Sequence, residues 1–450
     1  MSAERWFDRD RSREILLLAG PIIAGMGSQT VMNLVDTGMV GRLGPAPQAA
    51  AGLGSFTFWV LANLIIALGT GVQATVARRD GEEDKEGAGS GLDTGLMLAV
   101  AIGLPLGYTL AEAAPWFFSL LTDDAAVSSG GSRYLAIRLM GMGAVAANYC
   151  FRGFYNGIGR SMVYMSTLIV IHASNIFLNW VFIYGNLGSR AMGVEGAGLA
   201  SVLAAVIGTC VYTILTLTQA DVRSVYKPFR FRNITPDRIK RLTKLSVPEA
   251  IRGVLVMLGF LLFLDLHEAI GTRAAAGGTI LVNIASAGLL PAMGMGMAGA
   301  TLVGRHLGRG EADEARRLMW LAVRLGVVGI AVPAILLAVF AEPVLAIFTP
   351  DAPTIAEAAP ALRLFALASI FDVLPIVLVF SLLGAGATRW VAGVQVFQQY
   401  VLLLPLAALL GLVLELGVFG LWIGMFLSRV GLAAFAITKV RGDSWTRIEV

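Results

Sequence analysis

The chain has 450 residues, of which 56% are hydrophobic and only 14% are charged, and its formal net charge at pH 7 is +4. An average soluble domain carries roughly 25% charged residues, so this composition excludes a soluble enzyme, a disordered chain and a collagen-like or disulfide-rich scaffold. It indicates an integral membrane protein.

Twelve long apolar stretches follow one another along the chain. A helix needs about 20 such residues to cross a bilayer. Lipid admits only helices or closed barrels as spanning structures, and these stretches are too long for strands, so we expect an all-α membrane protein. The expected spans cover residues 14–40, 50–77, 92–114, 132–154, 162–185, 194–218, 243–268, 276–304, 315–340, 358–383, 391–411 and 418–438.

The basic residues are distributed unevenly among the loops. With both termini in the cytoplasm, 24 of the 34 Lys and Arg residues fall on the inside, and three fall on the outside. The positive-inside rule therefore predicts a multi-pass protein of the plasma membrane (the bacterial inner membrane) with both termini cytoplasmic. Residues 220–244 carry eight of the inside charges. We interpret them as a cytoplasmic linker, with contact to anionic lipid as the alternative.

The sequence repeats with an offset of 227 residues. The coinciding features are Pro21 with Pro248, Gly44 with Gly271, Gly157 with Gly384, Gly159 with Gly386, and "LLTDD" at 120–124 with "IFTPD" at 347–351. Each half holds an even number of spans, so both halves enter the membrane from the same side, as parallel repeats do. We expect an N-terminal six-helix bundle over residues 1–219, a basic linker over 220–242 and a C-terminal six-helix bundle over 243–450, around a central cavity that serves alternating-access transport.

Motifs of enzymes and metal sites are absent from the sequence. The chain has no Gly-Lys pair and so no P-loop, and "HEAIG" at 267–271 lacks the second histidine of a zinc protease. We therefore expect no enzyme activity, no metal and no cofactor. His267 lies near the outer end of the seventh span, and we expect it to be exposed.

Asp36 is an acid inside the first span. Ionisable residues are costly inside a membrane and commonly serve ion or proton pathways there. Asn33 lies one helical turn earlier on the same face. We interpret Asp36 as a proton- or cation-coupling group supported by Asn33, the alternative being a structural acid. Pro21 removes a backbone hydrogen bond from the same helix and is the expected site of a bend.

Two other spans carry polar side chains. The fifth holds His172, Asn175 and Asn179, whose spacings of three and four residues place them on one helix face. Amides can donate to a carboxylate or offer oxygens to an ion, and His172 is either a proton carrier or a packed residue. Asp372 is the main buried acid of the second half, and we expect a second coupling group there.

Three methionines alternate with glycines in the eighth span. Met293, Met295 and Met297 lie in "PAMGMGMAGA". Adaptable methionines suit a promiscuous apolar cavity, so they are candidates to line a substrate site. Close helix packing through the glycines is an equal alternative.

At these residues the chain resembles the multidrug and toxic compound extrusion (MATE) family. The resemblance rests on "P-x14-D-T-x2-V-G-R-L-G" from Pro21 to Gly44, on the "G-x-G" after the fourth and tenth spans, and on "GVEGAGLAS" at 193–201. It covers nearly the whole chain, and "VDT" looks most like the branch that includes DNA-damage-inducible protein F. It implies two six-helix bundles in the lipid bilayer. It also implies export of cationic or amphipathic small molecules, with no nucleic-acid partner, and we expect a monomer.

The resemblance also implies roles for single residues. Asp36 matches the first-span aspartate whose protonation accompanies bending of that helix, and Pro21 matches the proline at the bend. Asn175 matches a fifth-span asparagine of the same site, whereas Asn179 stands where several members have a second aspartate. Ser201 stands where others have threonine.

The coupling ion follows from the acids that are present. Asp372 sits twelve residues before Gly384, as the tenth-span acid does in the sodium-coupled branch, but that branch's seventh-span glutamate has no match near Val256. A sodium site needs several oxygens around a net negative charge, and each half keeps one carboxylate. We therefore expect exchange against protons, driven by a proton gradient, with sodium-coupled antiport as the alternative.

A flippase for lipids or lipid-linked sugars, from the wider superfamily, is a further alternative. Its cavity would use basic residues to hold a pyrophosphate. The arginines in or near spans are Arg133, Arg138, Arg152, Arg252, Arg324, Arg363 and Arg429. An intramembrane enzyme would need paired acids or a nucleophile constellation, and the sequence offers neither.

Overall fold

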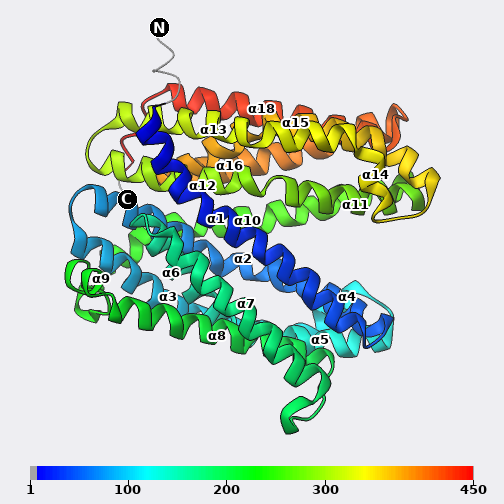
Figure 1. The fold of residues 1–450 in the computed structure, drawn as a ribbon, viewed down its shortest axis with the longest axis horizontal. Helices are drawn as coiled ribbons and strands as arrows, with labels where there is room; N and C mark the ends of the chain where they lie inside the picture. Colours follow the sequence, from blue (N-terminus) through cyan, green and yellow to red (C-terminus); the bar gives the residue numbers. More distant parts are fainter. Residues whose placement is uncertain (1–7, 449–450) are drawn as a thin grey trace. The chain divides into compact units, whose positions relative to one another are not determined.

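The computed structural model describes residues 8–448, and every regular element in that range is helical (Figure 1). The first half contains α1 (Arg9–Gly41), α2 (Pro45–Gly81), α3 (Lys85–Glu112), α4 (Ala114–Leu121), α5 (Ala125–Met140), α6 (Met142–Gly157), α7 (Ser161–Tyr184), α8 (Val194–Thr218) and α9 (Ala220–Val225). The second half contains α10 (Pro236–Ile270), α11 (Thr272–Gly288), α12 (Leu290–Gly308), α13 (Ala312–Val339), α14 (Ala341–Ala346), α15 (Ala352–Gly384), α16 (Thr388–Phe397), α17 (Leu404–Ala408) and α18 (Gly417–Arg441). Short 3-10 turns lie at Asn186–Gly188 and Phe231–Asn233, and π turns at Gln398–Leu403 and Leu409–Val413.

Eleven helical segments in the described range are long and apolar enough to cross a membrane. The predicted all-α membrane fold is therefore confirmed. The predicted span at 132–154 is instead divided between α5 and α6, each of 16 residues. The break falls at Gly141, which faces α8 closely: a Cβ there would lie 2.8 Å from the Val202 side chain.

The helices of the two halves begin in the same register. Six helix starts coincide at the offset of 227 residues: Arg9 with Pro236, Pro45 with Thr272, Lys85 with Ala312, Ala114 with Ala341, Ala125 with Ala352, and Ser161 with Thr388. A repeat inferred from scattered glycines and prolines therefore appears as a repeat of whole elements.

The turns that separate these helices also recur. Gly159 and Gly386, the second glycines of the two "G-x-G" motifs, have φ values of +78° and +85°, a left-handed conformation that glycine adopts at little cost. Asp124 and Asp351 cap α5 and α15, and each carboxylate accepts a backbone N–H from the first turn of its helix. The same turn and cap chemistry thus starts and ends equivalent helices in both halves.

Packing groups the described chain into two units. Residues 24–250 form one unit, and residues 251–448 with residues 8–23 form the other. α1 and α10 therefore each divide between the units, two residues after Pro21 and two residues after Pro248. The predicted bundles at 1–219 and 243–450 follow the repeat of the sequence. In the packing units, by contrast, the first part of α1 belongs with the second half of the chain, and the first part of α10 belongs with the first half.

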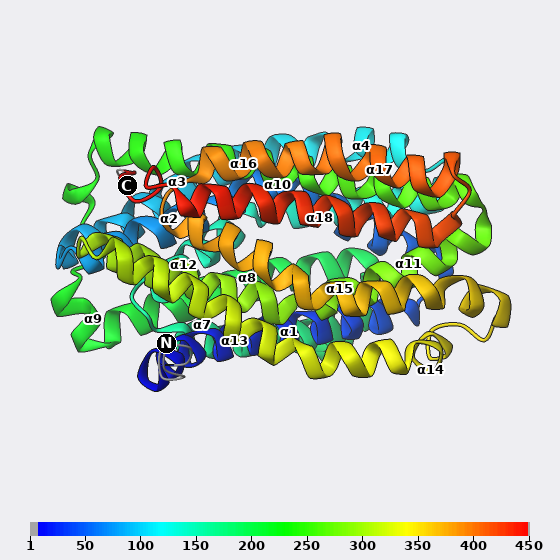
Figure 2. The ribbon, with the colours of Figure 1, turned by 90° about the horizontal axis from the view of Figure 1, so that it is seen from above.

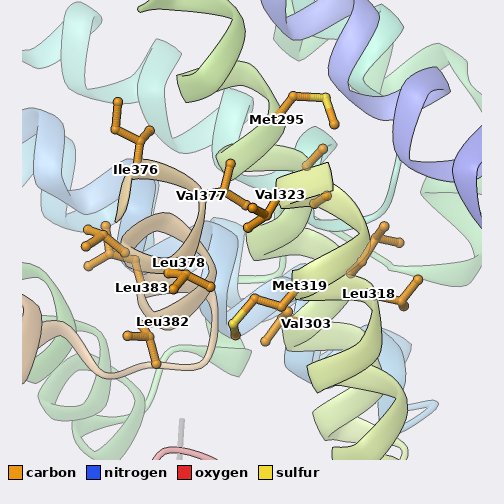
Figure 3. Close-up of a cluster of buried hydrophobic side chains, with 14 of the residues drawn as sticks. Met295, Val303, Leu318, Met319, Val323, Ile376, Val377, Leu378, Leu382 and Leu383 are labelled. Atoms are coloured by element: carbon orange, nitrogen blue, oxygen red, sulfur yellow. The ribbon is translucent and has the colours of Figure 1, made fainter. Parts of the chain in front are cut away.

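The unit of residues 8–23 and 251–448 is organised around α15. α13 and α18 run beside α15 along its length (Figure 1 and Figure 2). Side chains of α12, α13 and α15 interlock in a hydrophobic core (Figure 3). The labelled members of this core are Met295, Val303, Leu318, Met319, Val323, Ile376, Val377, Leu378, Leu382 and Leu383.

The unit of residues 24–250 is built on a close contact between α2 and α6. A Cβ on Gly153 would lie 2.3 Å from the carbonyl oxygen of Gly69, so only glycine lets the two backbones approach this far. Small residues serve this purpose in membrane helix packing. α7 packs against α8 in the same unit and carries the polar face predicted from the sequence.

Candidate functional site

A polar cluster in the unit of residues 24–250 gathers side chains from α1, α7 and α8. Asn179 Nδ2 donates to Asp36 Oδ1 at 2.6 Å and to Asn175 Oδ1 at 3.2 Å. Asn175 Nδ2 in turn donates to Ser201 Oγ at 3.4 Å. Asn175 and Asn179 are 5% and 1% exposed, whereas Asp36 is half-buried. The two amides therefore form a buried wall against one carboxylate.

The amides can be arranged in two ways around Asp36. If the Asn175 amide is turned over, its nitrogen donates to Asp36 Oδ1 at 2.9 Å and its oxygen accepts the Ser201 backbone N–H at 3.2 Å. Asn179 Oδ1 is buried and accepts no hydrogen bond from the described residues. The cluster therefore offers amide donors to Asp36 and also holds one buried amide oxygen that is free to accept.

His172 and Asn33 belong to a second chain of hydrogen bonds. His172 Nε2 pairs with Gln29 Oε1 at 3.2 Å, and its Nδ1 pairs with Ser28 Oγ at 3.2 Å. Because a carbonyl oxygen can only accept, Nε2 carries a proton and donates to Gln29. Ser28 Oγ also donates to the Gly25 carbonyl oxygen at 2.8 Å, so its single proton is shared between this carbonyl and Nδ1 of a neutral ring. Gln29 Nε2 donates to Asn33 Oδ1 at 3.2 Å, and Asn33 is exposed. Neither residue hydrogen-bonds to Asp36 within the described structure.

Arg138 is a neighbour of the cluster that sequence reasoning did not place there. Its guanidinium donates to Tyr134 Oη at 3.0 Å and to Ser55 Oγ at 3.3 Å, and it lies 4.1 Å from the ring centroid of Phe58. Arg138 interacts electrostatically with Asp36. The spacing of four residues from Tyr134 indicates a shared face on α5, but the contacts with α2 could not be read from sequence.

Asp372 lies in the other unit and has a different environment. It is 4% exposed on α15, and its Oδ1 has no hydrogen-bond partner among the described residues. Arg429 of α18 is the charged group that interacts with it. The second candidate is therefore an acid near an arginine, without the amide wall that surrounds Asp36.

The three methionines of α12 lie mostly inside their unit. Met295 and Met297 are 3% and 6% exposed, and Met295 belongs to the hydrophobic core (Figure 3), with Met293 at its edge. A Cβ on Gly296 would lie 2.8 Å from Phe380, so α12 approaches its neighbour through glycine. These contacts fit the packing alternative for Met295. Met293 is the least buried of the three.

The expectation that His267 is exposed is wrong. The side chain is fully buried, its Nδ1 donates to the Phe263 carbonyl oxygen at 2.9 Å, and Trp422 Nε1 donates to its Nε2 at 3.3 Å. A neutral ring satisfies both bonds, and this explains how a histidine is tolerated in an aromatic core. The neighbours Asp265 and Glu268 are exposed.

Of the seven arginines considered for a lipid-flipping cavity, Arg138 is described above and four others have side-chain partners within their own units. The contacts are Arg133 with Glu195 at 3.0 Å, Arg363 with Glu342 at 2.7 Å, Arg252 with Gln395 Oε1 at 2.7 Å, and Arg152 over the Tyr149 ring at 4.2 Å. Each guanidinium is thus engaged by a neighbouring helix or its own helix. Within residues 8–448, no three His, Cys, Asp or Glu side chains gather in a way that could hold a metal ion.

Comparison with known proteins identifies the family. The family model described as MatE matches residues 21–181 and again residues 248–409, one match in each half of the repeat. The two matches cover more than half of the chain, so the protein belongs to the MATE family of multi-pass membrane transporters and is not an enzyme.

Relatives and solved structures agree with this assignment over nearly the full length. The probable multidrug resistance protein NorM of Pasteurella multocida (strain Pm70) is 28% identical over 439 residues, which are 96% of this chain and 94% of that protein. A structure described as the outward-facing conformation of a multidrug resistance MATE family transporter of the MOP superfamily has a TM-score of 0.88 at 23% identity, covering 96% and 95% of the two chains. A MATE structure in the bent conformation gives the same values. At this identity the structures establish the shared fold.

Proposed function

We propose that the protein is a multidrug efflux transporter that exports cationic or amphipathic compounds in exchange for protons. The observation that carries this proposal is the hydrogen bond of 2.6 Å from Asn179 to Asp36, which places a membrane-embedded carboxylate in a cluster of neutral amides. The names of the similar proteins, which describe multidrug resistance, support the class of substrate.

The cluster can accommodate Asp36 with and without a proton. The ionised carboxylate accepts a hydrogen bond from Asn179 Nδ2, and a protonated carboxyl can donate its O–H to the amide oxygen if the Asn179 amide turns over. A cation and a proton compete for the same negative charge, because attraction between opposite charges is strong where water is scarce. This competition couples release of one to binding of the other.

The composition of the cluster favours the proton over sodium. A hard metal cation needs several oxygen ligands and a compensating negative charge. Here the negative charge is one carboxylate, and Asn179 supplies an amide where several relatives in the family have a second acid. Asp372 likewise stands as a single acid, next to a positive charge. We assign the coupling role to Asp36, and Asp372 is the second candidate.

We assign a conformational role to Pro21. α1 is continuous through this proline and divides between the two packing units just after it. The proline removes one backbone hydrogen bond from the helix at this point. A helix weakened there can bend when the charge of Asp36, fifteen residues later, changes.

The proposal also covers the location of the protein, its branch of the family and its source of energy. The distribution of basic residues supports a bacterial inner-membrane protein with both termini in the cytoplasm. The motif "VDT" at 35–37 supports a position near the DNA-damage-inducible protein F branch. We propose that one chain transports on its own, with an ion gradient as its source of energy and no cofactor.

The proposal is tested with the full chain in liposomes that have an acid interior and sodium-free buffer. Addition of a fluorescent cation such as ethidium should trigger proton efflux in the wild type and in Asp265→Asn, a control that removes an exposed acid. Asp36→Asn should lose this efflux. Loss in Asp372→Asn with retention in Asp36→Asn would move the coupling group to the second half, and proton efflux that survives in both variants would reject a carboxylate mechanism at these sites.

A further inference from the structure

A polar pocket lies within the unit of residues 24–250, away from the Asp36 cluster. It has a volume of about 240 Å³ and forms where the last turns of α2 meet the first turns of α3 and α10. Ser90 and Thr94 of α3, each 1% exposed, lie at its buried side. None of the residues of the Asp36 cluster lines it.

Three guanidinium groups surround this pocket: those of Arg79, Arg238 and Arg241. Arg79 is paired with Glu82 at 2.8 Å. Arg238 donates to a neutral acceptor, the backbone carbonyl of Asn233. Arg241 is exposed and makes no ion pair with the described residues. Arg238 also interacts electrostatically with the buried Asp93, so Arg241 is the guanidinium of the three without a carboxylate partner among the described residues.

Two acids, Asp84 and Asp237, also line the pocket. The carboxylate of Asp84 accepts the backbone N–H of Gly87 at 2.9 Å and so caps α3. Asp237 is exposed in the first turn of α10. With Glu82, which pairs with Arg79, three carboxylates accompany the three guanidiniums, so the positive charge of the pocket is local and lies at Arg238 and Arg241. The N-terminus of α10 adds partial positive charge at the same place, whereas the N-terminus of α3 is already capped by Asp84.

Hydroxyl groups complete the lining. Thr235 Oγ1 accepts the Arg238 backbone N–H at 3.4 Å, so its own O–H is still a donor. Ser90 presents another hydroxyl at the buried side. Guanidinium groups, hydroxyls and helix N-termini are the groups that proteins use to bind phosphate.

We propose that this pocket binds a phosphate group. The phosphate is carried by an anionic phospholipid headgroup or is a free phosphate ion, and both would meet the same guanidiniums. Basic pockets between membrane helices on the cytoplasmic side bind lipid headgroups in this way, and the unequal distribution of basic residues places α10's start on that side. The site would anchor the beginning of α10, one of the two helices that divide between the packing units.

The test uses the purified full chain in a neutral detergent. Isothermal titration with inorganic phosphate measures the first source, and native mass spectrometry with phosphatidylglycerol against phosphatidylcholine measures the second. The variants are Arg241→Gln, which removes a side chain without an ion pair, and Arg238→Gln/Arg241→Gln. The control is Lys240→Gln/Lys244→Gln, which removes the same charge from exposed positions of the same helix outside the pocket lining.

We expect the double arginine variant to bind at least one of the two probes about tenfold more weakly or worse, because charge-assisted hydrogen bonds to phosphate are lost. Arg241→Gln should show a smaller loss, and the lysine control should bind within about twofold of the wild type. A loss confined to phosphatidylglycerol assigns the pocket to a lipid headgroup, and a loss confined to inorganic phosphate assigns it to the free ion. The proposal is overturned if the wild type binds neither probe saturably, if the double variant binds as the wild type does, or if the lysine control loses as much.

Discussion

The groups that hydrogen-bond to Asp36 carry no charge of their own. Asn175 and Asn179 are both buried, and their spacing of one helical turn on α7 lets them act together on one carboxylate. The charge of this cluster therefore changes by one whole unit when Asp36 gains or loses a proton, with Arg138 as the fixed positive charge nearby. On the proposed function, we expect the amide at position 179 to favour the proton over sodium in this cluster.

Asn179→Asp should change the ion dependence of transport. The substitution keeps the shape of the side chain and adds a second carboxylate next to Asp36. In the wild type, Asn179 Nδ2 lies 2.6 Å from Asp36 Oδ1. Two neighbouring acids attract a cation more strongly than one. We expect ethidium transport by this variant to be stimulated at least severalfold by sodium, measured as flux in liposomes without a pH gradient. Asn179→Ala, the matched control, should gain no sodium stimulation, and an unresponsive Asn179→Asp would argue against a charge-based choice of ion.

Only part of the candidate site could be predicted from the sequence. The helical spacing of His172, Asn175 and Asn179 predicted their common face on α7. That Asn179 meets Asp36, 143 residues away, followed only from resemblance to a family. The contacts of Arg138 and the burial of His267 against Trp422 depend on how helices pack, and the spacing of residues on one helix carries no information about that.

At the scale of elements, the close approach of α2 and α6 depends on two glycines. A Cβ on Gly153 would meet the Gly69 carbonyl oxygen, and a Cβ on Gly69 would meet the Tyr149 carbonyl oxygen at 2.6 Å, and neither carbonyl can move independently of its helix. Dispersion contacts of this kind hold membrane helices together, because lipid provides no hydrophobic drive between them.

Gly153→Ala should destabilise the protein by roughly 1–3 kcal/mol, the usual cost of overpacking. Its Cβ would lie 2.3 Å from the Gly69 carbonyl oxygen. Gly52→Ala, in α2 itself, is the control, because no atom lies within 4 Å of the added carbon. Thermal unfolding in detergent should give a lower midpoint for Gly153→Ala and an unchanged or slightly higher one for Gly52→Ala. Equal midpoints would show that the α2–α6 contact tolerates the extra methyl group.

Pro21→Ala should stiffen α1 and slow transport. Alanine restores a backbone N–H that can pair with the carbonyl four residues earlier, and it removes the clash of the proline ring. If bending of α1 is part of the cycle, turnover should fall roughly tenfold, which corresponds to about 1.4 kcal/mol on the barrier. Pro105→Ala in α3 is the control, since α3 lies within one packing unit. Transport by Pro21→Ala at the wild-type rate would remove the bend from the mechanism.

At the scale of the whole molecule, most of the architecture follows from composition and repetition. Long apolar stretches predicted an all-helical membrane protein, and an offset of 227 residues, found from a few glycines and prolines, also relates six helix starts. The division of α1 and α10 between the packing units was not predictable, because a continuous apolar helix carries no mark of which neighbours each half contacts. The break at Gly141 was missed because it interrupts an apolar run without changing its hydropathy.

Exchange of an organic cation against a proton is the central claim, and one measurement tests it most directly. Wild-type protein in sodium-free liposomes with an acid interior is given ethidium outside while the internal pH is recorded. We predict that ethidium enters the liposomes and that the interior becomes more alkaline at the same time, without any sodium. Ethidium movement that begins only when sodium is supplied, with no change of internal pH, would contradict proton coupling and assign the exchange to sodium.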